Sequence, residues 1–228
     1  MTDLRFEKLS LRGYRVGKAS WFPALRELIK SEISAELDED DGLFIGYGMF
    51  SDGLPYTLQD NYDFPEEKLC FQAAILENDF LKAVFLPELG GRLWSLYDKE
   101  HQRDLILANT AFLPCNLAIR NAWFAGGVEF NCGRRGHDEQ TVSPRFAAVI
   151  HTDKYPVLRI YEYQRDRGTP FQYDCFLPEC SRFLYIRGRI WNPNRHLVPM
   201  YWWSNIALPE VAGSRVIVPA KNAFANWY

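Results

Sequence analysis

The fold is decided around the stretch Trp123-Phe124-Ala125-Gly126-Gly127-Val128-Glu129-Phe130-Asn131-Cys132-Gly133-Arg134-Arg135-Gly136-His137-Asp138. It gathers carboxylate, amide, guanidinium and imidazole groups in a run that four glycines interrupt. Glycine lets the backbone take left-handed turns and lets other groups approach closely. The stretch therefore predicts a shaped loop or a bulged strand, whose polar side chains either converge on a ligand or satisfy one another.

The composition around this stretch indicates a globular β protein. The chain has 228 residues, 47% hydrophobic and 24% charged, which allows a sizeable core and excludes wholesale disorder. Aromatic residues make up 15% of it, beside 13 Pro and 15 Gly. Bulky rings fit a pleated sheet while Gly and Pro form its turns. Trp and Tyr also suit sugars, because a ring face covers apolar C–H groups while the polar tip makes a hydrogen bond.

The charge and the cysteines argue against several partner classes. A net charge of −3 gives no reason to expect nucleic acid or an anionic membrane surface as a partner. No apolar run is long enough for a membrane span, and residues 1–10 lack a signal-peptide core. Five cysteines without a Cys-x-x-Cys pair argue against disulfides or zinc and predict free thiols in a cytoplasmic protein.

A helix is expected near the N-terminus. Pro23 stands where a helix can begin, and apolar residues follow it at helical spacing: Leu25, Leu28, Ile29, Ile33 and Leu37. The acidic run 38–41 and Gly42 end the pattern. We therefore predict an N-terminal extension with an amphipathic helix over residues 1–45, followed by a β domain over residues 46–228.

The rest of the chain reads as short strands. Apolar or alternating runs occur at Leu69–Glu77, Phe80–Leu86, Arg92–Tyr97, Asp104–Ala108, Phe146–Ile150, Val157–Tyr163, Phe171–Leu177, Phe183–Trp191, Met200–Leu208 and Arg215–Val218. Many short strands at near-regular spacing, with no helix between them, predict a sandwich or barrel of antiparallel sheets. The chain stops at Tyr228 without a polar tail or capping element, so we expect the sheets to be incomplete at the C-terminus.

Three segments in one order carry a family resemblance. They are Leu76–Leu81 running on to Leu86-Pro87-Glu88-Leu89-Gly90-Gly91-Arg92-Leu93-Trp94-Ser95-Leu96, Gly126–Asn131 with Gly136-His137, and Tyr201–Ala207. From about Gly46 onward the chain resembles the domain family DUF5107, often found ahead of tetratricopeptide repeats in longer bacterial proteins. The resemblance implies a mainly β, galactose mutarotase-like antiparallel β-supersandwich, and a C-terminal repeat region in the parent protein.

The same resemblance implies sugar chemistry. Mutarotases of similar fold use a Glu base, a His acid and a second His on a strand that reads Asn-His-x-Tyr-aromatic-Asn. His137 matches the acid, whereas the comparable strand here, Tyr201–Asn205, has no histidine. We predict Glu129 and His137 as the catalytic pair of a glycoside hydrolase or a sugar epimerase. A glycosidase needs a second carboxyl group, for which the candidates are Asp138, Glu139 and Glu210.

Other residues suit the binding of a carbohydrate. Neighbours on a strand point to opposite faces, so one of Trp202 and Trp203 is expected in the core. We predict a substrate-binding set made of stacking rings and hydrogen-bond donors: Arg92, Trp123, Asn131, Arg135, Trp203 and Asn205.

Structural roles compete with these functional ones. His137 can cap a turn after Gly136, and Glu129 can be held in a structural salt bridge with Arg92, Arg134 or Arg135. Adjacent residues splay apart on a strand, so residues 137–139 are not expected to ligate a metal, and no motif indicates another cofactor. The alternative function is a non-catalytic carbohydrate-binding or scaffold domain of a longer repeat-containing protein.

Overall fold

The structure is a computed structural model that describes residues 1–23, 54–133 and 136–222. Every regular element in these ranges is a strand. The strands are β1 Asp3–Gly13, β2 Glu67–Glu77, β3 Leu81–Leu86, β4 Arg92–Asp98, β5 Arg103–Asp104, β6 Ala111–Phe112, β7 Cys115–Ala118, β8 Asn121–Trp123, β9 Val128–Asn131, β10 Phe146–Ile150, β11 Val157–Gln164, β12 Thr169–Phe176, β13 Tyr185–Ile190 and β14 Trp203–Ile206. The mainly β prediction is confirmed. The predicted helix after Pro23 lies outside the described residues.

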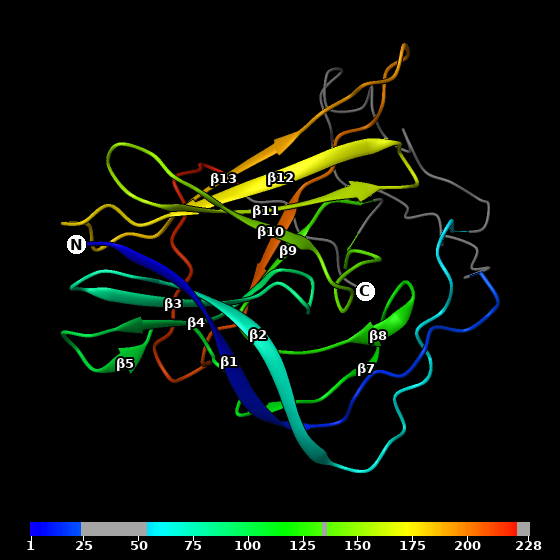
Figure 1. The fold of residues 1–228 in the computed structure, drawn as a ribbon, viewed down its shortest axis with the longest axis horizontal. Helices are drawn as coiled ribbons and strands as arrows, with labels where there is room; N and C mark the ends of the chain where they lie inside the picture. Colours follow the sequence, from blue (N-terminus) through cyan, green and yellow to red (C-terminus); the bar gives the residue numbers. More distant parts are fainter. Residues whose placement is uncertain (24–53, 134–135, 223–228) are drawn as a thin grey trace.

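The strands form two main sheets and a short ribbon (Figure 1). One sheet has the order β14-β9-β4-β3-β2-β1-β6, with β5 beside β4; the other has the order β10-β11-β12-β13. The ribbon consists of β7 and β8. Neighbouring strands run antiparallel, except for the short pairing of β1 with β6. Within the described part of the chain no helix is long and apolar enough to cross a membrane.

The N-terminal strand β1 belongs to the larger sheet. It pairs with β2 along its whole length, from Asp3 opposite Glu77 to Gly13 opposite Glu67. The first residues of the expected extension therefore share a sheet with the β domain. The boundary predicted between residues 45 and 46 lies outside the described ranges and stays a prediction.

The main core lies between the two sheets. Phe85 and Phe130 from the larger sheet pack with Ile160 and Tyr173 from the four-stranded sheet, and all four are at most 3% exposed. The rings of Phe130 and Tyr173 are 4.6 Å apart. Each such side chain contributes about 1.5–3 kcal/mol on burial, so this layer fixes the sandwich. A second apolar cluster, which includes Trp94, Phe112 and Phe124, covers the other face of the larger sheet.

Glycine is required where β3 turns into β4. Gly91 has φ +64°, and a Cβ there would lie 2.0 Å from the hydroxyl oxygen of Tyr173. That hydroxyl donates a hydrogen bond of 2.8 Å to the Gly91 carbonyl. Gly127 has φ +69°, and its Cβ would lie 2.1 Å from the Leu93 carbonyl oxygen. The two glycines let β4, β9 and the facing sheet approach closely.

A buried amide joins the β2–β3 turn to a distant loop. Asn78 is 3% exposed, and its Oδ1 accepts hydrogen bonds from the backbone N–H groups of Phe80 and Leu81. Its Nδ2 donates to the carbonyl groups of Pro178, Glu179 and Ser181 at 2.8–3.1 Å. The turn between β2 and β3 is thus held in place by a loop about 100 positions further along the chain.

Some predicted strands are shorter than expected, and one is absent. The run Asp104–Ala108 contributes only its first residue to β5, and Met200–Leu208 only Trp203–Ile206 to β14. Arg215–Val218 forms no strand, and Val216 and Ile217 are 91% and 86% exposed. No strand of the described chain lies beside residues 215–218, so their alternating side chains have no cross-strand partners there.

Candidate functional site

The candidate site is built on β9 and β14. On β9, Val128 and Phe130 join the core between the sheets, so alternation turns Glu129 and Asn131 to the opposite face. In the register of the two strands, Trp203 lies opposite Asn131 and Asn205 lies opposite Glu129. Directly opposed residues share one face of a sheet. Two predicted residues from each strand therefore stand on the same surface.

The Glu129 carboxylate is surrounded by donors. It is 4% exposed, and its Oε1 accepts a hydrogen bond of 2.5 Å from the Thr141 hydroxyl and lies 3.5 Å from Nη2 of Arg92. Its Oε2 lies 2.8 Å from Nδ1 of His137 and accepts a 3.2 Å bond from the indole N–H of Trp123. Four side chains thus fix both oxygens.

These contacts decide the protonation state of Glu129. Burial by itself raises its pKa, but the His137 hydrogen bond, the Arg92 charge and the Thr141 hydroxyl outweigh burial and lower the pKa to about 2. Glu129 is therefore ionised at neutral pH and accepts hydrogen bonds only.

Arg92 lies beneath the carboxylate. It is 2% exposed, and its Nη1 donates to the carbonyl oxygens of Phe124 and Gly126 at 2.5 and 3.0 Å. Its Nη2 donates to the Thr141 hydroxyl at 3.1 Å. Burial lowers the pKa of Arg92 to about 10, although the Glu129 charge raises it, so Arg92 stays charged at neutral pH. A ligand would meet Glu129 and its neighbours before it met this guanidinium.

The imidazole of His137 stands between two indoles. Its ring centroid is 5.0 Å from that of Trp123 and 5.1 Å from that of Trp203. Because the Glu129 carboxylate only accepts, the neighbouring Nδ1 of His137 carries the proton, and Nε2 of the neutral ring is then a base. The side chain of His137 is 17% exposed, and no described residue is hydrogen-bonded to Nε2.

The loop that carries His137 is anchored at both sides. The Asn131 Oδ1 accepts from the backbone N–H of Asp138 at 2.7 Å, and the Asp138 carboxylate accepts from the backbone N–H groups of Cys132 and Gln140. Arg145 Nη2 lies 3.2 Å from the same carboxylate. The Gly136 N–H donates to the hydroxyl of Tyr201 at 2.8 Å. The position of the imidazole is thus fixed by the fold.

The two carboxylates that follow His137 are buried away from it. Asp138 and Glu139 are each 1% exposed. Burial raises the pKa of Asp138. Burial, together with the charge of Asp138, raises the pKa of Glu139 to about 7. Glu139 Oε2 accepts one hydrogen bond, at 3.3 Å from Gln164, and Oε1 has no hydrogen-bond partner among the described residues.

The structure thus brings together most of the predicted residues. Trp123, His137 and Trp203 are half-buried and adjacent, while Glu129, Arg92 and Asn131 form the buried layer below them. Trp202 points to the other side and packs near Phe130 and Tyr173, as expected of one member of the pair. Arg135 lies outside the described residues. Asn205 is half-buried opposite Glu129.

Sequence reasoning missed Thr141 and Arg145. Thr141 bridges Arg92 and Glu129 through its hydroxyl, and Arg145 holds Asp138 and the Phe130 carbonyl. Neither residue belongs to a motif, and Thr141 lies 12 positions from Glu129. Only the folded chain brings them to the site.

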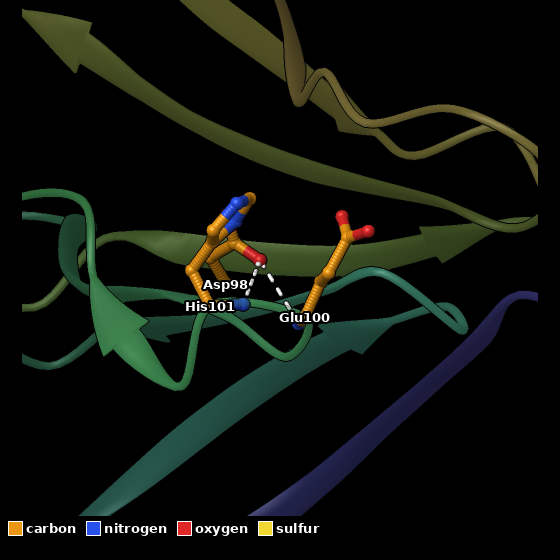
Figure 2. A group of neighbouring side chains, drawn as sticks. All are labelled: Asp98, Glu100 and His101. Carbon is orange, nitrogen blue, oxygen red and sulfur yellow. Dashed lines mark hydrogen bonds and ion pairs between the residues drawn. The ribbon is translucent and has the colours of Figure 1, made fainter.

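A second cluster, Asp98, Glu100 and His101, has metal-binding residue types but the contacts of a turn (Figure 2). Asp98 Oδ1 accepts from the backbone N–H groups of Glu100 and His101, and Oδ2 lies 2.8 Å from the His101 Nδ1. Glu100 forms an ion pair with Arg182. The turn after β4 accounts for these side chains without an ion.

The geometry defines a mainly β sandwich domain in which a buried Arg–Glu pair holds a half-buried histidine between two indoles. Residues 50–225 match the family described as "Domain of unknown function (DUF5107)", so the chain belongs to that family. Among solved structures it is similar to a TPR-domain containing protein from Parabacteroides distasonis ATCC 8503, at a TM-score of 0.70 and 19% identity. The match covers 91% of this chain and 32% of that one, so the chain spans about a third of that protein's length. At this identity the likeness shows the fold alone.

Proposed function

We propose that this domain is carbohydrate-active and that its sugar lies against the surface formed by Trp123, His137 and Trp203. One observation carries the proposal: a partly exposed imidazole is held between two indoles by a buried, ionised carboxylate. Indole faces cover the apolar C–H surface of a sugar ring. The imidazole adds a group that can both accept and donate a proton.

In this arrangement His137 is the acid–base residue and Glu129 is its positioning residue. Nε2 of His137 takes the proton of the anomeric hydroxyl while a C1=O bond forms and the bond between C1 and the ring oxygen breaks, and the imidazolium gives that proton to the ring oxygen; ring closure on the other face of C1 reverses these transfers. Glu129, with a pKa of about 2, stabilises the imidazolium and is not itself a proton donor. Arg92 and Thr141 hold Glu129 in place.

Epimerase-type chemistry fits this site better than glycoside hydrolysis by two carboxyl groups. Glycosidases need two carboxyl groups that face the bond. Glu129 is buried and fully hydrogen-bonded, and Asp138 and Glu139 are each 1% exposed. A single proton-transferring imidazole suffices to move protons between oxygens of an aldose.

The second candidate is a non-catalytic carbohydrate-binding or scaffold domain. It is favoured by the contacts of Glu129, which resemble a structural ion pair with Arg92 as much as a catalytic group. It is also favoured by the solved protein of similar fold, which contains TPR domains and extends well beyond the match.

A cytoplasmic location is part of the same proposal. All five cysteines, at positions described by the structure, are free, and three of them are exposed. Reduced exposed thiols are typical of cytosolic proteins, which supports a cytoplasmic location. A C-terminal repeat region in the parent protein is part of the same proposal.

The test follows aldose mutarotation by anomeric proton signals in NMR, and glycoside cleavage by a chromogenic panel. We expect turnover that falls about 10²–10⁴-fold in His137→Gln, while calorimetric sugar binding persists. His151→Gln, at an exposed histidine outside the site, is the matched control and should keep full activity. Binding without turnover would establish the second candidate. If sugars neither bind nor change the Trp fluorescence, a sugar ligand is refuted.

A further inference from the structure

The edge of the four-stranded sheet at β13 is open. Among the described residues β13 pairs only with β12, so one side of the strand has no neighbouring ladder (Figure 1). Backbone N–H and C=O groups along such an edge are a template for another strand. The candidate sugar site does not use this edge.

The inward face of this edge leaves apolar surface uncovered. Ile186 is 37% exposed, although Cys175, directly opposite on β12, is fully buried. A groove of about 380 Å³ runs along the strand and is lined by Gly188, Arg189, Ile190, Met200 and Trp202. Met200 is 73% exposed. The sandwich therefore has room and apolar surface for one more strand.

The outward face of β13 carries two positive charges. Arg187 lies opposite Asp174, but that carboxylate is already bound by Arg159 at 2.7 and 2.8 Å. Arg189 lies opposite the neutral Gln172. Within the described ranges neither Arg187 nor Arg189 has an ion-pair partner, and both are exposed. The edge thus alternates between cationic and apolar positions.

We propose that the β13 edge docks an extended segment of a partner polypeptide in which acidic and apolar residues alternate. Backbone hydrogen bonds would add the segment to the sheet. Its carboxylates would lie beside Arg187 and Arg189, and its apolar side chains would enter the groove at Met200 and Trp202. Cross-strand pairs of opposite charge stabilise such an addition.

The same features argue against two other occupants. A second copy of β13 would bring arginines against arginines, which destabilises strand pairing. A sugar is also disfavoured on the outer face, because Tyr155, Phe176 and Tyr185 stack on one another with centroids 5.5 and 5.3 Å apart and nearly parallel planes. Both faces of Phe176 and one face of each tyrosine are covered within this stack.

The experiment measures fluorescence anisotropy of two labelled eight-residue peptides, one alternating Glu with Val and the other Lys with Val. We expect the Glu-Val peptide to bind the protein at least tenfold more tightly and to protect the β13 amides from hydrogen exchange. In Arg187→Glu/Arg189→Glu its affinity should fall on the order of tenfold while that of the Lys-Val peptide rises. Lys8→Glu/Arg103→Glu changes the net charge equally at exposed positions and should leave both affinities unchanged.

Several results would overturn the proposal. They are equal affinity for the two peptides, no binding of the Glu-Val peptide, or an unchanged preference in the Arg187→Glu/Arg189→Glu protein. A concentration-dependent dimer that protects the β13 amides without any peptide would assign the edge to a second copy instead. Thermal unfolding of both double variants checks that the reversed charges leave the fold intact.

Discussion

Replacing Glu129 by Gln tests whether the buried carboxylate holds the site together. The amide keeps the size of the side chain but removes the negative charge next to Arg92, which is 2% exposed. Arg92 would keep its carbonyl partners at Phe124 and Gly126 and lose the one counter-charge with which it pairs within the described chain. We therefore expect the variant to fold but to be clearly less stable.

The pKa of Glu129 sets the size of the effect. It falls from an ordinary 4.5 to about 2 in the folded chain, and each unit corresponds to about 1.4 kcal/mol, so ionised Glu129 contributes about 3 kcal/mol. Because the folded pKa is the lower one, this contribution is complete above pH 4.5 and is lost as the pH falls toward 2. The difference between wild type and variant should be about 3 kcal/mol at pH 7 and about half of that at pH 3.

Urea unfolding followed by Trp fluorescence at pH 7, 5, 4 and 3 measures this difference. Glu66→Gln is the matched control, because Glu66 is 41% exposed and pairs with Arg12 at the surface, where an ion pair contributes at most about 1 kcal/mol. A Glu129→Gln penalty that stays constant from pH 7 to pH 3 would show that the charge of Glu129 is not what stabilises the site.

Three further changes test other parts of the structure. Gly91→Ala should lower the free energy of unfolding by more than about 3 kcal/mol, because the new Cβ would meet Tyr173. Gly136→Ala, at a similar φ but with open space around it, should lower it by about 1 kcal/mol. Thermal melts compare the two variants. Asn78→Ala should cost about 2–4 kcal/mol in urea, because buried carbonyl and N–H groups lose their partner. Glu139→Gln should stabilise the protein at pH 8 but hardly at pH 4.5. The reason is that the raised pKa of Glu139 makes the wild type lose stability as the pH rises from 4.5 through 7. An equal gain in stability at both pH values would contradict this.

The fold was largely predictable because the apolar pattern of its strands is local. The runs at Phe146–Ile150 and Val157–Tyr163 match β10 and β11 closely, and in β11 the buried Leu158 and Ile160 stand on either side of the half-buried Arg159. Partners are not local, and so nothing in the sequence of Asp3–Gly13 indicated that it pairs with β2.

The sequence allowed the residues of the site to be predicted, but not the role of each residue. Glu129 and His137 were chosen by residue type, and the structure places them 2.8 Å apart. That Glu129 is buried and strongly acidic, with Thr141 and Arg92 beneath it, depends on the closing of β4 and β9. A sequence shows which groups are present, whereas their depth and pKa arise from packing.

The pairing of β1 with β2 has a consequence for synthesis on the ribosome. Gly13 and Glu67 pair across 53 intervening residues of the chain. At about 5–20 residues per second, the first strand is made several seconds before its partner exists. During this interval Phe6, Leu9 and Leu11 have no ladder to join. Strand β1 thus stays unpaired for this interval, and slow codons between the two strands would lengthen the exposure of its apolar residues.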